Sequence, residues 1–272
     1  MSRGRRRAEP EILVLPDPAS CAAAAADCLV RAIEIAVDDH GRADVATTGG
    51  STPSAIYAAL LGPPLRARVP WERLHVWFGD ERFVTRADPN ANASLLDAAF
   101  FPGGRPAGPL PAANVHPFPV DATLAAGGRP ADCARRYASE MRAALRRDAA
   151  DRPAFDAILV GIGPDGHLLS VFPRSAAFDR VAWAVAVPAP AHIGPHLPRV
   201  TLNPAVLDAT PALLAVAFGE AKASVVGEVF GGARDVRRLP AQLARRPGAT
   251  WILDAAAASR LPGAITAGAN PR

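Results

Sequence analysis

Short runs of apolar residues alternate along this chain with longer stretches of helical character. Glycine, proline or charge bounds each short run, so strands are expected at residues 12–15, 44–48, 74–79, 155–161, 182–187, 212–218 and 250–253. Helices are expected at residues 20–37, 53–61, 92–100, 130–148, 203–208, 220–230 and 239–246. The alternation predicts an α/β fold with a Rossmann-like, mainly parallel sheet and helices on both faces.

The arrangement predicts one α/β domain over residues 10–265. A disordered basic tail is expected at residues 1–9 and a flexible C-terminus at residues 266–272. Proline recurs in residues 102–119 and 188–198, so both are expected to be loops at the rim of a site. The apolar part of the start is too short for a secretory signal, and no run approaches the roughly 20 apolar residues of a membrane helix.

Composition narrows the function classes. Half of the 272 residues are hydrophobic and 21% are charged, as in ordinary globular proteins. The net charge of +4 comes from arginines spread along the chain, which gives little support to nucleic-acid binding. Three cysteines without a CxxC pair suggest neither a disulfide framework nor a zinc site, so we expect a reducing, cytoplasmic setting. Lys222 is the only lysine among 30 basic residues.

In parallel sheets, ligands bind at the carboxyl ends of the strands, so candidate chemistry is sought there. The first candidate is the turn Gly49, Gly50, Ser51 and Thr52, between a predicted strand and a predicted helix. Its glycines, hydroxyls and helix start are the parts of a phosphate cradle. The alternative is a plain turn in which Ser51 or Thr52 caps the helix. No Gly-Lys-Ser/Thr follows, so a nucleotide P-loop is not indicated.

The second candidate is Asp80, Glu81 and Arg82 at another strand end, with Asn92 downstream. Two acids and an arginine could orient a substrate, because a guanidinium binds phosphate or carboxylate through two parallel hydrogen bonds. The alternative is a solvated loop with a local ion pair. The sequence alone leaves both interpretations open.

The third candidate is the glycine-rich segment 161–173. It satisfies G-x-G-x-x-G, but Pro173 would cut short the expected helix and residues 181–187 hold no acid for a ribose, so a dinucleotide site is rejected. His167 could instead serve as a general base, with Asp165 orienting its ring. The alternative is a turn histidine bonded to the backbone.

Two further cations follow proline-rich or strand segments. Arg199 could be a surface charge or an anion ligand, and Lys222 at a helix start opposes the helix dipole unless an anion lies nearby. His192 and His196 are four residues apart, but the intervening glycine and proline disfavour a shared helix face. We therefore expect no metal site.

Taken together and in this order, these segments resemble the 6-phosphogluconolactonase family, within the wider group that includes glucosamine-6-phosphate deaminases. That family carries a GGSTP turn, a DER segment followed by Ser-Asn, a signature close to GxGxDGHTASLFP, an R-[VI]-T-L segment and a G-x-x-K element. The matches, spread over residues 10–255, are residues 49–53, 80–82 with Asn92, 161–173, 199–202 and 219–222.

The chain also departs from the family pattern. Leu168 and Leu169 replace Thr-Ala, Val171 replaces Leu, and Ala91 replaces the usual serine. These changes could alter pocket shape or substrate preference. Deaminases typically carry Phe-Asn-Glu-Pro after the histidine, and their acid helps to open the sugar ring. Residues 170–173 lack it, which favours the lactonase branch.

The resemblance implies hydrolysis of 6-phospho-D-glucono-1,5-lactone to 6-phosphogluconate in the oxidative pentose phosphate pathway, without metal or cofactor. His167 would be the general base and Asp165 would hold its ring. Arg82 or backbone N–H groups would stabilise the oxyanion. The residues assigned to substrate binding are Gly49, Gly50, Ser51, Thr52, Asp80, Glu81, Asn92, Arg199 and Lys222.

Two alternatives stay open. One is an amino-sugar phosphate deaminase or isomerase, which an ammonia-release assay would distinguish. The other is a non-catalytic sugar-phosphate sensor; such sensors usually carry a helix-turn-helix, for which the residues before the first strand leave no room. The expected partner is a small sugar phosphate, with no nucleic acid or membrane, and the protein is expected to be a monomer or weak homodimer.

Overall fold

The computed structural model describes residues 9–49, 51–102 and 109–263. The predicted basic tail up to residue 8 and the predicted flexible C-terminus lie outside the described residues. No described helix is long and apolar enough to cross a membrane.

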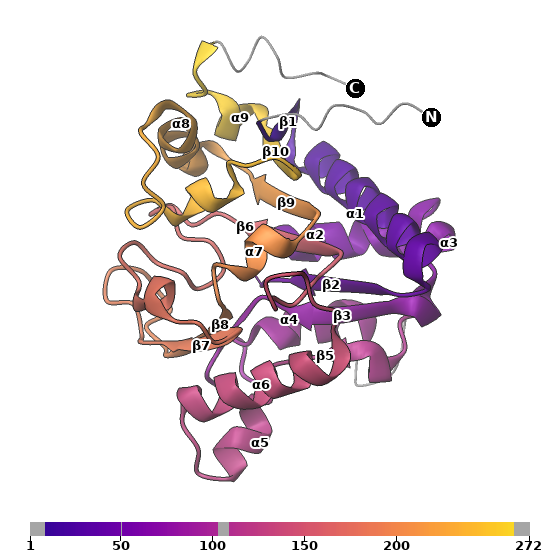
Figure 1. Ribbon diagram of the computed structural model, residues 1–272. Coiled ribbons are helices and arrows are strands. Elements are labelled where there is room, and N and C mark those ends of the chain that lie inside the picture. Colours follow the sequence, from indigo (N-terminus) through magenta and orange to yellow (C-terminus); the bar gives the residue numbers. More distant parts are fainter. Residues whose placement is uncertain (1–8, 50, 103–108, 264–272) are drawn as a thin grey trace.

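A parallel sheet of seven strands forms the centre of the molecule (Figure 1). Its spatial order is β1 (Glu11–Leu15), β10 (Ala249–Asp254), β9 (Ala212–Ala217), β6 (Ala157–Gly161), β2 (Ala43–Thr47), β3 (Leu74–Phe78) and β5 (Val115–His116). The chain builds outward from β2 through β3 to β5, then returns to β6 and builds outward through β9 to β10. The strand order therefore reverses between the adjacent strands β2 and β6, which is where a parallel sheet forms its ligand crevice.

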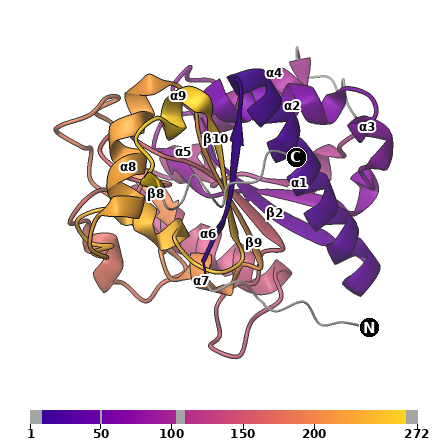
Figure 2. The same cartoon turned by 90° about the horizontal axis from the view of Figure 1, so that it is seen from above.

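Helices cover both faces of this sheet, as the sequence predicts (Figure 2). The α-helices are α1 (Pro18–His40), α2 (Ser51–Leu61), α3 (Leu65–Arg68), α4 (Asn92–Phe100), α5 (Val120–Ala125), α6 (Pro130–Ala144), α7 (Val206–Ala209), α8 (Ala223–Gly231) and α9 (Ala255–Ala258). Helices α1 and α2 pack together on one side, and α8 lies on the other (Figure 2). The α/β fold class expected from the alternation is confirmed.

The first helix illustrates how the sequence sets its own boundaries. Asp17 caps α1 by accepting a hydrogen bond from the backbone N–H of Ser20 at 2.7 Å, and Pro18 suits the first helical position. Gly41 ends the helix in the left-handed conformation, with φ at 80°. The buried face consists mainly of small residues: Cys21, Ala22, Ala25, Ala26, Leu29, Val30, Ile33 and Ala36. Such a face lets the helix approach the sheet closely.

A second, antiparallel sheet of three strands was not expected. It consists of β4 (Asp80–Arg82), β8 (Arg199–Leu202) and β7 (Ala184–Val187), in that order, and α6 packs against it. The predicted strand at residues 182–187 exists as β7, but it belongs to this small sheet. The predicted helix at residues 239–246 is a 3₁₀-helix, η6 (Pro240–Ala244), and the predicted loop at residues 102–119 contains β5.

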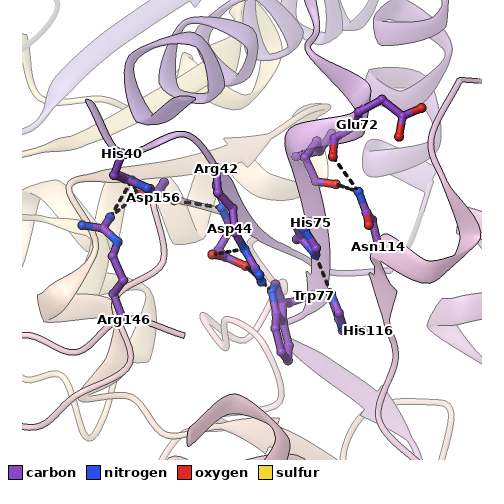
Figure 3. A network of polar contacts seen from close by, with 11 residues as sticks. His40, Arg42, Asp44, Glu72, His75, Trp77, Asn114, His116, Arg146 and Asp156 are labelled. Carbon is purple, nitrogen blue, oxygen red and sulfur yellow. Dashed lines mark hydrogen bonds and ion pairs between the residues drawn. The ribbon is translucent and has the colours of Figure 1, made fainter. Parts of the chain in front are cut away.

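A network of buried polar groups joins the strands near their amino ends (Figure 3). Asp156 accepts hydrogen bonds from the backbone N–H of Asp44 and from Arg146, both at 2.8 Å, and bonds to His40 at 3.0 Å. Arg42 binds Asp44 through two nitrogens, at 2.6 and 2.9 Å. This paired arrangement compensates the burial of both carboxylates at the end of the sheet opposite the reversal crevice.

Two histidines lie in the same region. His75 Nδ1 and His116 Nε2 are 2.9 Å apart, and the indole of Trp77 stacks on the His116 ring at 4.1 Å between centroids (Figure 3). Burial lowers the pKa of His75, and burial together with His75 lowers the pKa of His116 to about 4. Both rings are therefore neutral in the folded protein at neutral pH.

Candidate active site

A cleft of about 700 Å³ opens where the strand order reverses. Its walls come from the carboxyl ends of β2, β6 and β9, the start of α2, the small sheet and the loop before β8. The candidate residues that line it are Gly49, Thr52, Asp80, Arg82, Asn92, His167, Arg199 and Lys222. Residues from five separate sequence segments thus meet in one place.

His167 and Asp165 form a close pair beside the end of β6. Nδ1 of His167 lies 2.5 Å from Oδ1 of Asp165, and the backbone N–H of His167 donates to the same oxygen at 3.2 Å. The imidazole lies against Gly163, where the Cβ of any larger residue would overlap the ring. The glycine-rich turn is thus required by the position of His167.

Asp165 is ionised in this arrangement. Burial alone would raise its pKa, but the hydrogen bond and charge of His167, with a further hydrogen bond from His192, hold that pKa well below its usual range. A carboxylate without a proton can only accept hydrogen bonds. The Nδ1 of His167 is therefore the donor, so in the neutral imidazole Nε2 carries the lone pair that a general base requires.

The small sheet positions three of the candidate residues. Side chains alternate across a strand, so Asp80 and Arg82 of β4 face the cleft, whereas Glu81 between them does not line it. Arg82 lies directly opposite Arg199 in the antiparallel register of β4 and β8. Two cationic side chains thus stand side by side at one edge of the cleft, an arrangement that is unfavourable until an anion joins it.

Three cations of the cleft have no carboxylate partner within the described part of the chain: Arg82, Arg199 and Lys222. Arg199 is only 4% exposed, donates to the backbone oxygen of Pro195 at 3.1 Å, and leaves its Nε without a described partner. The Nε of Arg82 is likewise buried and unpartnered there. Burial lowers the pKa of Arg199 and that of Lys222. Partly buried cations without described counterions favour the binding of an anion.

Glu81, which the sequence analysis assigned to substrate binding, does not line the cleft. Its carboxylate accepts hydrogen bonds from the backbone N–H groups of Arg82 at 2.7 Å, Asn92 at 2.6 Å and Ala93 at 2.8 Å. Burial raises the pKa of Glu81 to about 7, against the lowering effect of these donors. Glu81 therefore ties β4 to the start of α4 from behind the cleft.

Asn92 is held by this tie and faces the cleft. Its Nδ2 donates to the backbone oxygen of Asp80 at 2.9 Å and to Oδ1 of that residue at 3.1 Å. These bonds orient the amide so that Oδ1 faces Gly49, where an added Cβ would collide with it. This oxygen is buried and has no described hydrogen-bond partner. It is an acceptor available to a hydroxyl group.

The predicted phosphate turn is described in part. Gly49 and Thr52 line the cleft, and Ser51 begins α2. Gly50 and the side chain of Ser51 lie outside the described part of the structure. The amino end of α2 therefore opens onto the cleft, as the motif predicts.

The structure adds two residues to the site that the sequence analysis did not assign to it. Ser170 donates to Oδ2 of Asp80 at 2.6 Å, and His192 bonds to Asp165 at 2.7 Å. Leu169, one of the departures expected to alter pocket shape, lines the cleft with φ at 54°. Leu168, the other departure from the family pattern, is fully buried and not in the cleft wall. Among the described residues, no group of three or more His, Cys, Asp or Glu could hold a metal ion.

The fold and its cleft are those of the α/β proteins that place a ligand site at the carboxyl edge of a parallel sheet, where the strand order reverses. The matching family model, glucosamine-6-phosphate isomerases/6-phosphogluconolactonase, spans residues 16–252. The chain belongs to this family.

Individual relatives agree with that assignment. A 6-phosphogluconolactonase of Streptomyces coelicolor is 32% identical over 262 residues, which are 93% of this chain and 95% of the relative. One of Synechocystis is 30% identical over 86% of this chain and 91% of its own. Among solved structures, the 6-phosphogluconolactonase of Trypanosoma brucei superposes with a TM-score of 0.78 at 25% identity, covering 94% of this chain and 100% of that one.

Proposed function

We propose that this protein hydrolyses 6-phospho-D-glucono-1,5-lactone to 6-phosphogluconate. The observation that carries the proposal is a histidine oriented by a carboxylate in one cleft with three cations that lack described counterions. The relatives at about 30% identity, which carry the name 6-phosphogluconolactonase, support the same substrate.

The chemistry starts at Nε2 of His167. This nitrogen takes a proton from water while the water oxygen bonds to the carbonyl carbon of the lactone. The tetrahedral intermediate then collapses, and the bond between that carbon and the ring oxygen breaks. The proton on Nε2 passes to the departing ring oxygen, which becomes a hydroxyl group. One water is consumed, and His167 returns to its starting state.

Binding energy far from the reacting carbon would position the lactone. Arg199 and Lys222, with Thr52 at the start of α2, would bind the phosphate, because cations and helix amino ends both favour anions. The oxygen of Asn92 would accept a hydrogen bond from a sugar hydroxyl. Arg82 would stabilise the negative charge that develops on the carbonyl oxygen.

The related amino-sugar reaction is less consistent with the site. Residues 170–173 supply no acid for ring opening, and Ser170 is already bonded to Asp80. The test is a paired assay with lactone and glucosamine 6-phosphate, corrected for spontaneous lactone opening. Lactone hydrolysis without ammonia release is the expected result. Ammonia release without lactone hydrolysis would overturn the proposal.

A further inference from the structure

Asp165 is shared by two imidazoles. Its Oδ1 meets Nδ1 of His167 at 2.5 Å, and its Oδ2 meets Nε2 of His192 at 2.7 Å. His192 comes from the proline-rich loop, residues 188–198, far along the chain from Asp165. Because the carboxylate is ionised, each nitrogen that faces it is a donor. The three side chains form one row, with His167 at its inner end and His192 at its outer end.

The loop that carries His192 is part of the cleft. Gly194 lines the wall. His196 Nδ1 lies 2.6 Å from the backbone oxygen of Pro190, so that side chain ties the loop to itself. In the hydrogen bonds of the described residues, His192 is the side chain of this loop that reaches the turn bearing Asp165 and His167.

Phe172 contacts both imidazoles. The His192 ring meets it edge-on at 5.8 Å between centroids, and the His167 ring meets it at 4.7 Å. The guanidinium of Arg199 lies 5.3 Å from the same ring. The Phe172 ring thus packs against both histidines that share Asp165.

We propose that His192 is a positioning residue for the lactone hydrolysis proposed above: by donating to Oδ2, it holds Asp165 with Oδ1 directed at His167 and keeps the 188–198 loop against the cleft. The inference rests on that proposed function. It is based on three observations: the two histidines share the Asp165 carboxylate, the loop of His192 lines the cleft, and the Phe172 ring contacts both histidines.

Sharing the carboxylate has a predictable effect on proton affinity. The two imidazoles divide the acceptor strength of the Asp165 carboxylate, so removing His192 leaves a carboxylate that attracts the proton on His167 more strongly. The acid limb of the pH–rate profile then moves to higher pH. The other charges that act on Asp165 are those of Arg199 and Lys222, and they stay unchanged.

His192 is not a core residue, so a substitution there can be tested for its effect on catalysis separately from any loss of stability. Its side chain is 52% exposed, against 18% for His167. Substitution at such a position is expected to leave the folded structure intact. The thermal midpoint of each variant checks this point before any kinetic comparison.

The experiment is a double-mutant cycle of His192→Ala with Asp165→Asn, with His192→Gln as the conservative variant. His196→Ala is the matched control, because His196 lies in the same loop but its described hydrogen bond goes to Pro190 within the loop. We expect His192→Ala to lower kcat about tenfold through misplacement of the base. It should also raise KM and shift the acid limb to higher pH.

The cycle decides whether His192 acts through Asp165. In the Asp165→Asn background, His192→Ala should change kcat less than about twofold, because contacting residues are not additive. His192→Gln keeps an N–H donor and should recover part of the rate, and His196→Ala should leave the acid limb in place. An equal loss in both backgrounds with an unmoved acid limb would overturn the inference. An inactive wild-type protein would instead overturn the proposed function.

Discussion

At the scale of single residues, the hydrogen bond between His167 and Asp165 decides which nitrogen faces the cleft. The carboxylate keeps a proton on Nδ1. Nε2 has no hydrogen-bond partner among the described residues and is available to water. His167→Ala should therefore lower kcat about a hundredfold or more while product binding stays nearly unchanged. Steady-state kinetics and calorimetric titration with 6-phosphogluconate test this. Unchanged turnover would remove His167 from the mechanism.

Lys222 belongs to the same scale. It is half-buried in the cleft wall, in η5 (Glu220–Lys222), with no described ion-pair partner. If it binds the phosphate, which does not react, Lys222→Ala should raise KM about tenfold or more and lower kcat less. Arg135→Ala, on an exposed helix face, is the control. A fall in kcat with unchanged KM would mean that the lysine acts in the transition state instead.

At the scale of elements, the pairing of β4 with β8 places Arg82 opposite Arg199. Opposed like charges destabilise a strand pair, so an anion bound between them should stabilise the protein. At about 100 times Kd, phosphate or 6-phosphogluconate should add about 2.7 kcal/mol to the free energy of unfolding. Arg199→Gln should remove most of this gain without lowering stability in chloride.

Thermal unfolding in phosphate and in chloride of equal ionic strength measures the effect. A rise of several degrees is expected in the wild type, and a much smaller one in Arg199→Gln. An equal rise in both proteins would place the anion elsewhere on the molecule.

The small sheet also marks the limit of prediction at this scale. The short apolar runs predict six strands of the parallel sheet, because strands buried on both faces are apolar almost throughout. Strand β4 has three residues, all charged, and pairs with residues more than a hundred positions away. Nothing local in the sequence indicates that pairing.

The same limit applied to two site residues. Alternation along a strand would have turned Glu81 away from the cleft, had the segment been recognised as a strand. The spacing along the chain relates His192 to His196, as a candidate metal pair. In the fold, the hydrogen-bond partner of His192 is Asp165. The sequence could predict the glycine-rich turns and the pairing of His167 with Asp165, because these depend on local geometry. Contacts made through loops depend on the whole fold.

At the scale of the whole molecule, the two ends of the sheet carry different polar groups. The cleft lies at the carboxyl ends of the strands, and the polar network lies near the amino ends (Figure 3). The network includes His75 and His116, whose pKa values are lowered in the folded protein, to about 4 for His116.

This pair makes stability depend on pH. In the unfolded chain a histidine binds a proton near its usual pKa of about 6.5, whereas folded His116 stays neutral down to about pH 4. Stability is therefore fully present above about pH 6.5 and falls as the pH drops toward 4. Because the rings are only partly buried, we expect a loss on the order of 1–2 kcal/mol over this range.

Urea unfolding between pH 4.5 and 7.5 measures that slope. His116→Gln should flatten it, because the glutamine does not titrate. His196→Gln, which removes a histidine from an exposed loop, should leave it as in the wild type. Identical slopes in all three proteins would assign the acid sensitivity to other groups.

The cleft histidine and the pair His75 and His116 lie at opposite ends of the sheet, so acid should inactivate the protein in two ways that reverse at different rates. If His167 is the general base, as proposed, its protonation in the open cleft reverses quickly, so activity lost in this way returns as soon as the solution is neutralised. Protonation of His75 and His116 at the amino ends of the strands destabilises the fold, so activity lost through unfolding returns only at the rate of refolding. Turnover should therefore recover at once after a brief exposure to acid, and only at the rate of refolding after an exposure long enough for the protein to unfold.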